Sequence, residues 1–309
     1  MDVKRVVIEE LHKPARKNFK RRRTIIKGLH DLYQADLVEM IPYASTNRGF
    51  RYILMVLNAF SKKLWARPVK RKTGEEVTKA MKQILNEVKV MPKNLQTDQG
   101  KEFFNKHFQE LIEKQKINHY TTYSNPKASL VERCNRTIKN MMWKEFSLQG
   151  NYKWLPILQQ IVSKYNNTKH STTGFKPDDV SMRNEKKILN SAYSHLKTID
   201  PRKAKFTVGD HVRISKYREA FKKGYTPNWS NEIFKIRKVK PTNPRTYLLV
   251  DEKGENIEGG FYELELQKVK YSDVFLVEKV LKRRGNMVFV KWLGLDKTHN
   301  SWLSKNAIL

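Results

Sequence analysis

The chain is poor in cysteine and in acidic residues. Cys134 is its only cysteine among 309 residues, so no disulfide can form within the chain and no zinc site built from two or more thiolates can exist. No stretch approaches the roughly twenty consecutive apolar residues of a membrane-spanning helix. No apolar core follows the basic N-terminal residues, as it would in a signal peptide. We therefore expect a soluble, intracellular protein that does not bind a membrane.

The shortage of acidic residues leaves the chain strongly basic. It has 62 Lys and Arg against 31 Asp and Glu, which gives a formal net charge of +31. A polyanion is then the expected partner, and nucleic acid is the simplest one. Residues 1–30 are rich in Lys and Arg and show little hydrophobic periodicity, which predicts an extended basic arm. In this arm Arg21, Arg22 and Arg23 would contact phosphates, although a solvated tail or a nuclear-targeting run has the same composition.

From residue 31 to residue 180 the apolar pattern predicts an α/β domain with a mixed sheet. Strand-like segments come first, and strands alternating with helices follow, an order that implies a sheet flanked by helices. The predicted elements are strands over 32–40, 51–60 and 63–69, a helix opening with a capping box at 73–76, a strand over 95–98, a helix over 103–116, a strand over 117–122 and helices over 129–150 and 152–170.

The rest of the chain has a different pattern of charged and apolar residues. Residues 181–203 are charged and weakly amphipathic, which predicts a helical linker. Residues 204–268 form short alternating segments separated by turns, a pattern typical of a small β-barrel. Residues 272–309 make a last small unit, with segments over 274–283 and 288–292 and a terminal segment from about residue 300.

Three acidic residues lie in positions typical of a metal site. Asp36 falls within a strand, Asp98 at the exit of another, and Glu132 in the first turn of a helix. Carboxylates held rigidly at one end of a sheet can bind a pair of divalent ions for phosphoryl transfer. Simpler explanations exist, because Asp98 is also a good turn residue and Glu132 also fits a capping box with Ser129 as N-cap.

The sequence around these acids resembles the integrase core of retroviruses, LTR retrotransposons and Maverick/Polinton transposons. The matching stretches are YQADLV at 33–38, TDQGKEF at 97–103 and KASLVERCNRT at 127–137. The 33 residues between Asp98 and Glu132 are slightly fewer than in the D,D-35-E pattern of retroviral members. The basic lead-in at 12–23 and the stretch at 33–40 are most similar to the Maverick/Polinton branch.

This resemblance implies an RNase H-like fold and DNA integration. The implied reaction trims a 3′ DNA end by hydrolysis, and the new 3′-hydroxyl then attacks target double-stranded DNA. Asp36, Asp98 and Glu132 would hold two divalent metal ions, Mg²⁺ or Mn²⁺. No covalent enzyme intermediate is needed, so Cys134 is expected to be a packed residue and not a nucleophile. A nuclear homo-oligomer, dimer or tetramer, on DNA is implied as well. Relatives commonly carry an N-terminal His/Cys zinc domain that this sequence does not contain, so either the sequence begins downstream of such a domain or assembly relies on other contacts.

Helix geometry predicts DNA contacts beside Glu132. Positions three, four and seven residues after Glu132 share its helical face, and they hold Asn135, Arg136 and Lys139. Arg136 and Lys139 match positions that contact the donor DNA end in relatives. Arg133 and Lys127 complete the predicted DNA-binding set, and an ordinary solvated basic face is the alternative.

The C-terminal segments resemble two known modules. Residues 204–268 are similar to the SH3-like DNA-binding barrel that follows many integrase cores. Residues 272–309 are similar to a chromodomain, in which an aromatic cage holds a methylated ammonium. Phe275 and Trp292 match two cage positions, whereas Leu295 replaces the third aromatic. The resemblance therefore implies a partial cage with a chromatin contact, and a structural or nucleic-acid role stays open.

Two other functions fit the same sequence. One is a catalytically inactive, domesticated protein derived from such an integrase, which would bind DNA or chromatin. The other is an RNase H-like nuclease, which would cut DNA without joining it. The intact set of three acids favours the active integrase.

Overall fold

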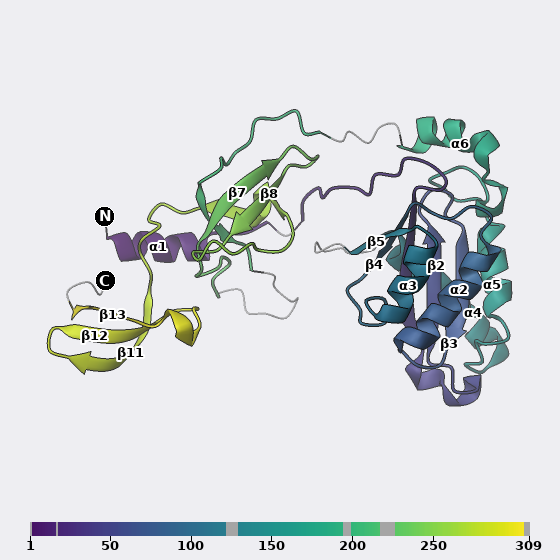
Figure 1. The fold of residues 1–309 in the computed structure, drawn as a ribbon, viewed down its shortest axis with the longest axis horizontal. Helices are drawn as coiled ribbons and strands as arrows, with labels where there is room; N and C mark the ends of the chain where they lie inside the picture. The colour runs from purple at the N-terminus through teal and green to yellow at the C-terminus, as the bar shows by residue number, and fades with distance from the viewer. Residues whose placement is uncertain (1, 17, 122–128, 194–198, 217–225, 306–309) are drawn as a thin grey trace. The chain divides into compact units, whose positions relative to one another are not determined.

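The computed structural model describes residues 2–16, 18–121, 129–193, 199–216 and 226–305. Contacts divide the chain into two units (Figure 1). We call Thr24–Leu196 the core unit, and Met1–Arg23 together with Lys197–Leu309 the terminal unit. Lys127, a predicted DNA contact, lies outside the described residues.

The core unit is built on a five-stranded mixed sheet in the order β3-β2-β1-β4-β5. The first three strands form an antiparallel meander, and β4 and β5 continue the sheet in parallel with β1. The predicted α/β fold with a mixed sheet is confirmed. The strands are β1 Leu32–Glu39, β2 Tyr52–Asn58, β3 Leu64–Val69, β4 Asn94–Thr97 and β5 Asn118–Thr121.

Helices cover both faces of this sheet (Figure 1). Helices α2 (Gly74–Glu87) and α3 (Lys106–Lys114) pack on one face, and α4 (Ser129–Gln149) and α5 (Leu158–Asn166) pack on the other. Successive side chains of a strand point to opposite faces. In β1, Ala35 is therefore buried against α2 and α3, whereas Asp36 lies on the side of α4.

The predicted helix over 152–170 is wrong at its beginning. Helix α5 starts only at Leu158, because the preceding backbone is held by a distant side chain. The amide oxygen of Asn47 accepts hydrogen bonds from the backbone N–H groups of Trp154 and Leu155, at 2.8 and 3.0 Å. Asn47 is 1% exposed, so this contact fixes the chain between α4 and α5.

Helix α2 begins where the sequence predicts, but without the capping box. The N-cap residue Thr73 makes no side-chain capping bond. Glu76 instead accepts hydrogen bonds from the backbone N–H groups of Lys70 and Arg71, at 3.1 and 2.9 Å. The carboxylate therefore shapes the turn before the helix, although the helix starts at the predicted place.

The terminal unit contains two antiparallel sheets. The first has five strands in the order β10-β6-β7-β8-β9, and the second has three in the order β11-β12-β13. Phe206, Val212 and Tyr247 belong to the buried core of the first sheet. The strands are β6 His211–Ile214, β7 Phe234–Lys240, β8 Thr246–Val250, β9 Phe261–Tyr262, β10 Leu266–Lys268, β11 Val277–Arg284, β12 Met287–Trp292 and β13 Ser301–Ser304.

The N-terminal arm is not extended throughout, which corrects the prediction for residues 1–30. Residues Val3–His12 form helix α1, which buries Val7 and Leu11 on one side. The carbonyl of Leu11 accepts a hydrogen bond from Asn228 N–H at 2.8 Å, and the indole of Trp229 donates to the carbonyl of Lys13 at 2.8 Å. The arm is therefore partly a structural piece of the terminal unit.

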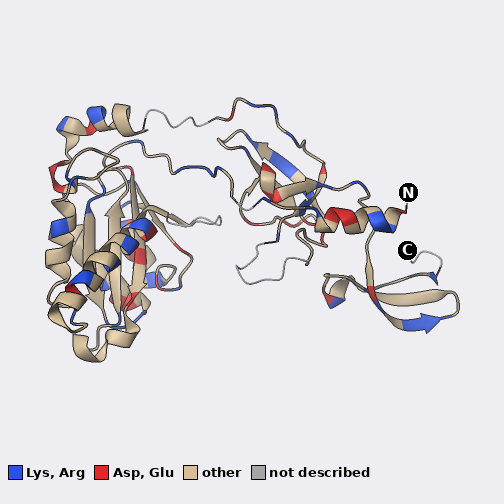
Figure 2. Ribbon diagram, turned by 180° about the vertical axis from the view of Figure 1, so that it is seen from behind, with Lys and Arg blue, Asp and Glu red and all other residues tan. Residues whose placement is uncertain are grey.

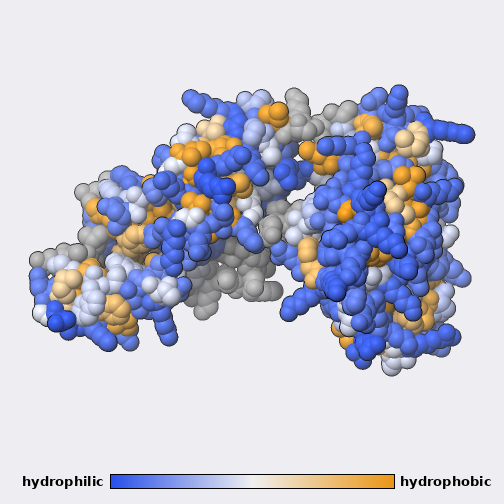
Figure 3. Space-filling view, viewed as in Figure 1, coloured by the Kyte–Doolittle hydropathy of each residue, from blue (hydrophilic) through white to orange (hydrophobic). Residues whose placement is uncertain are grey.

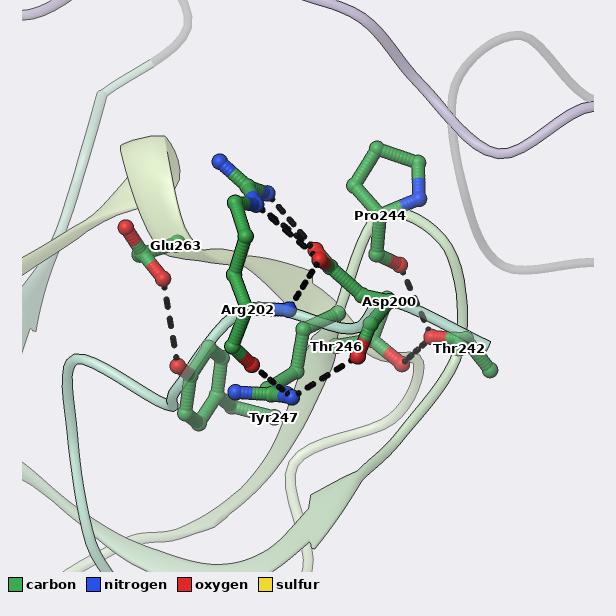
Figure 4. Close-up of polar contacts among 8 residues, drawn as sticks. Asp200, Arg202, Thr242, Pro244, Thr246, Tyr247 and Glu263 are labelled. Atoms are coloured by element: carbon green, nitrogen blue, oxygen red, sulfur yellow. Dashed lines mark hydrogen bonds and ion pairs between the residues drawn. The ribbon is translucent and has the colours of Figure 1, made fainter. Parts of the chain in front are cut away.

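The predicted helical linker over 181–203 is helical over 182–193, and residues 194–198 lie outside the described residues. Helix α6 spans Met182–Ile188 and a π-helical turn follows to Tyr193, whereas the described residues from 199 to 203 form neither helix nor strand. Arg202 pairs with the buried carboxylate of Asp200 at 2.6 Å, and Arg245 donates to the carbonyl of Asp200 at 3.1 Å (Figure 4). These bonds, with Arg202 the main cause, lower the pKa of Asp200 and tie this segment to the sheet.

The described helices include none that is long and apolar enough to cross a membrane. Hydrophilic side chains cover most of the surface seen in Figure 3, with smaller apolar patches between them. Basic residues are spread over both units (Figure 2).

Candidate active site

Asp36 lies in the middle of the central strand β1 and is half-buried. One of its oxygens accepts a hydrogen bond from Leu37 N–H at 2.9 Å, and the other from the Asn135 amide of α4 at 2.7 Å. The pKa of Asp36 is raised to about 6, mainly by burial and in smaller part by the negative charges of Asp98 and Glu132. Asp36 is thus near enough to both other predicted carboxylates for their charges to act on it.

Asp98 directly follows β4 and is half-buried. It accepts a hydrogen bond from Gly100 N–H at 3.2 Å, so it shapes the turn that the sequence allowed for. The hydroxyl of Thr97 donates to the carbonyl of Asp98 at 2.7 Å and also lies 2.9 Å from a ring nitrogen of His119. Asp98 therefore both shapes this turn and lies near enough to Asp36 to raise its pKa.

Glu132 is exposed in the first turn of α4. Ser129 is already the first residue of this helix, so it is not the N-cap of a capping box. The backbone N–H groups of Leu130 and Val131, which have no partner within the helix, both donate to the side-chain oxygen of Gln34, at 3.1 and 3.0 Å. The capping explanation for Glu132 is therefore not supported.

Gln34 joins the three elements that carry the three acids. Besides its two bonds to α4, its amide nitrogen on β1 donates to the Gln96 oxygen on β4 at 2.8 Å. Gln34 is 0% exposed and Gln96 is 4% exposed. Buried polar groups bonded in this way fix the relative positions of the elements that bear them.

The sequence analysis missed both glutamines, although a signal was present. Each stands two residues before an acid, in the repeated pattern Gln-x-Asp at 34–36 and 96–98. Residues two apart on a strand share a face of the sheet. The pattern therefore predicts that Gln34 and Asp36 share a face of β1, and that Gln96 lies on β4 two residues before Asp98.

The donor set fits a hard divalent cation. Within the described ranges, no three His, Cys, Asp or Glu side chains stand ready to hold a metal ion. Asp36, Asp98 and Glu132 nevertheless supply the carboxylate oxygens that Mg²⁺ and Mn²⁺ prefer. A cation among them would relieve the crowding of negative charge seen at Asp36.

The predicted DNA contacts on α4 separate into two groups. Arg133, Arg136 and Lys139 are exposed, and none of them forms an ion pair with another described residue. Asn135 is 8% exposed and its amide is bonded to Asp36. Its position is thus that of a residue that orients Asp36, and the DNA contact predicted for it stays a prediction.

The three arginines of the N-terminal segment lie against the terminal unit. The guanidinium of Arg21 stacks over the ring of Phe19 at 4.5 Å, and Phe19 packs edge-on against Tyr262. The backbone N–H of Arg22 donates to the hydroxyl of Tyr262 at 2.9 Å. The side chains of Arg22 and Arg23 are exposed.

The structure brings the two predicted cage aromatics together. The rings of Phe275 and Trp292 are 6.0 Å apart between centroids and nearly perpendicular, at 64°. The indole of Trp292 donates to the hydroxyl of Ser301 at 3.0 Å. Binding of methylated lysine by these rings stays a prediction.

Cys134 is a packed residue, as the sequence predicts. It is 4% exposed on α4. Burial raises the pKa of its thiol to about 11, so the thiolate needed for nucleophilic attack is scarce at neutral pH.

Comparisons with known proteins agree with this geometry. Residues 29–125 match the family described as "Integrase core domain". A transposon-derived protein of Caenorhabditis elegans is 35% identical over 195 residues, which are 63% of this chain and 65% of that protein. The Pro-Pol polyprotein of feline foamy virus is 23% identical over 251 residues, which are 73% of this chain and 20% of the polyprotein. The chain thus spans less than two thirds of either relative's length.

A solved structure has a similar fold over most of the chain. It is a chain of the simian T-cell lymphotropic virus intasome in complex with PP2A regulatory subunit B56 gamma, with a TM-score of 0.55 and 18% identity, covering 84% of this chain and 88% of that chain. This likeness and the sheet topology show an RNase H-like fold. The family match shows that the chain carries an integrase core domain of the retroviral kind at residues 29–125, and the relative in Caenorhabditis elegans makes it a homologue of a transposon-derived protein.

Proposed function

We propose that this protein is a DNA integrase or transposase of the Maverick/Polinton type, which trims 3′ DNA ends and joins them to target DNA. The observation that carries the proposal is the buried amide network of Gln34, which holds β1, β4 and the start of α4 together. These are the elements that bear Asp36, Asp98 and Glu132. The integrase-core match over residues 29–125 supports the same reaction.

In this proposal each group has a definite task. Asp36, Asp98 and Glu132 hold two divalent ions, and Asn135 orients Asp36 through its hydrogen bond. Bound Mg²⁺ or Mn²⁺ would activate the attacking oxygen and stabilise the leaving one. Arg136 and Lys139, exposed on the same helix, neutralise DNA phosphates near the acids.

The terminal unit fits an accessory role on DNA or chromatin. We infer that its five-stranded sheet is an SH3-like DNA-binding barrel and that its three-stranded sheet is chromodomain-like. The strand orders and the many basic residues support this reading (Figure 2). We also propose a nuclear location and a homo-oligomer on DNA, since joining two DNA ends to one target requires both ends to be held together.

The test uses the purified full chain, Mg²⁺ or Mn²⁺, and duplexes bearing the terminal repeats of the parent element. Joined products that disappear in Asp98→Asn are expected. The matched control is Asp178→Asn, which removes a surface carboxylate paired with Lys63 at 2.9 Å and should leave joining intact. Cutting without joining would instead indicate a nuclease, and DNA binding without either reaction would indicate an inactive derivative.

A further inference from the structure

The three-stranded sheet of the terminal unit has one buried face and one open face. In β12, Val288 and Val290 are 2% and 0% exposed, and the intervening Phe289 points to the opposite side. Phe289 is paired across the ladder with Trp302 of β13 and with Lys282 of β11. Directly paired residues lie on the same face. The open face therefore carries Lys279, Lys282, Arg284, Met287, Phe289, Lys291, Trp302 and Ser304.

An aromatic pair occupies the middle of the open face. The rings of Phe289 and Trp302 lie 5.4 Å apart between centroids and are tilted by 40°. Trp302 is 44% exposed and the nearby Met287 is 41% exposed. Adjacent aromatic rings that reach the surface present flat faces on which another ring can stack.

Unpaired cations surround these rings. Lys279, Lys282 and Arg284 are exposed on β11, and none of the three forms an ion pair with a residue that the structure describes. Lys291 is the exception on this face, since it pairs with Glu278 at 2.6 Å. The end of β11 stands out as a basic stretch in Figure 2.

We propose that this open face binds single-stranded nucleic acid. Unpaired bases would stack on Trp302 and Phe289, and Lys279, Lys282 and Arg284 would contact the phosphates. Aromatic platforms bordered by cations are how proteins bind single strands, whereas a duplex hides its base faces in the helical stack. The charge of the face excludes a basic peptide as the occupant.

This site is separate from the partial cage. Trp292 follows Val290 by two residues on β12, so it lies on the opposite face from Phe289. Phe275 packs against Trp292 there. The proposed site thus needs neither methylated lysine nor the metal-binding acids, and it can be tested in the presence of EDTA.

The experiment maps contacts on the unaltered full chain. An oligonucleotide of about 8 nucleotides, within the usual site size of a single-strand module, carries one 5-iodouracil and is crosslinked to the protein by light. The expected crosslinks fall on Trp302 or Phe289. Crosslinks confined to other parts of the chain would overturn the proposal, whether or not any variant folds.

Three variants give an independent answer. Trp302→Ala should weaken binding of the single strand about five-fold or more, because one stacked base is lost. Trp302→Phe keeps a stacking ring and should bind nearly as well as the original chain. Trp143→Ala, the control, removes a tryptophan of similar exposure, 40%, on α4 and should change nothing. Equal losses in Trp302→Ala and Trp302→Phe, or full competition by the matching duplex, would contradict base stacking.

Discussion

At the scale of single residues, the geometry of the acidic site depends on an amide that both donates and accepts. A carboxamide offers one oxygen and one NH₂ group, so Gln34 can satisfy two helix N–H groups and Gln96 at once. A carboxylate in its place would lose the donor, and an aliphatic side chain would lose both. Position 34 is therefore as restricted chemically as the acids themselves.

We predict that Gln34→Leu separates α4 from the two strands. Leaving the buried N–H groups of Leu130 and Val131 without an acceptor should cost about 1–3 kcal/mol of unfolding free energy. If the proposed reaction is correct, the Mg²⁺ concentration needed for half-maximal joining should also rise. The control is Gln159→Leu, which removes a hydrogen bond of 2.9 Å from the side-chain amide of Gln159 to the carbonyl of Ala66, away from the acids. An unchanged Mg²⁺ requirement in Gln34→Leu would show that the network does not position them.

At the scale of elements, a few long-range side-chain bonds decide where helices and loops begin. Asn47 bonds to the carbonyls of Tyr43 and Tyr152 and to two backbone N–H groups before α5. Tyr152, in turn, packs with Tyr43 at 4.8 Å between ring centroids. This corner is therefore held by both polar and aromatic contacts.

Asn47→Ala should lower the unfolding free energy of the core unit by about 3 kcal/mol, because several buried backbone groups lose their partner. Urea unfolding followed by circular dichroism measures the loss. Asn151→Ala is the matched control, since the amide of Asn151 is exposed and bonds only within its own turn. A loss no larger than that of the control would mean that Asn47 merely fills space.

Acid should weaken the core unit through His170. Burial, and then the positive charges of Lys62 on the β2–β3 turn and Arg133 on α4, lower the pKa of His170 from 6.5 to about 4. The unfolded chain then binds more protons than the folded one between these values. Stability is fully present above about pH 6.5 and is lost as the pH falls toward about 4.

The measurement compares the urea midpoints of the core unit at pH 7 and pH 5. His170→Asn keeps an acceptor for the Thr172 N–H, which the ring nitrogen of His170 binds at 3.1 Å, and it should lose less stability on acidification. His211→Asn changes an exposed histidine of the terminal unit and should keep the original pH dependence. The same acid loss in all three proteins would exclude His170 as its source.

Features set by residues close together in the sequence could be predicted, whereas features set by contacts between distant residues could not. The strands β1–β3 and the placing of Asp36, Asp98 and Glu132 within or beside their elements were predicted because alternation and short motifs are local signals. The start of α5 and the helix α1 were not, because Asn47 and the partners of Leu11 lie far along the chain. The Gln-x-Asp repeat was local and readable, and its meaning appears only once β1 and β4 are known to be neighbours.

At the scale of the whole molecule, the two ends of the chain form one unit, and the residues of the core unit lie between them in the sequence. Residues Met1–Arg23 belong with Lys197–Leu309, and the Lys270 N–H donates to the carboxylate of Glu10 at 3.1 Å. Basic residues lie in both units (Figure 2), so each unit contributes to the large positive charge of the chain.

Leu11→Asp should therefore destabilise the terminal unit and leave the core unit unchanged. Leu11 is 3% exposed, and a carboxylate at this place would be buried without a partner. Ile8→Asp on the same helix is the control, because Ile8 is 41% exposed. Hydrogen exchange reports both units separately. If Leu11→Asp speeds exchange in β1–β5, or leaves exchange in β6–β10 unchanged, the assignment of α1 to the terminal unit is contradicted.

The packing of α1 also sets an order of events during synthesis. Trp229, which bonds to the Lys13 carbonyl, lies 216 residues further along the chain. At translation rates of about 5–20 residues per second, the first helix waits roughly 10 to 40 seconds for its partner. The apolar side chains of Val7 and Leu11 therefore stay uncovered on the ribosome until the segment with Asn228 and Trp229 has been made.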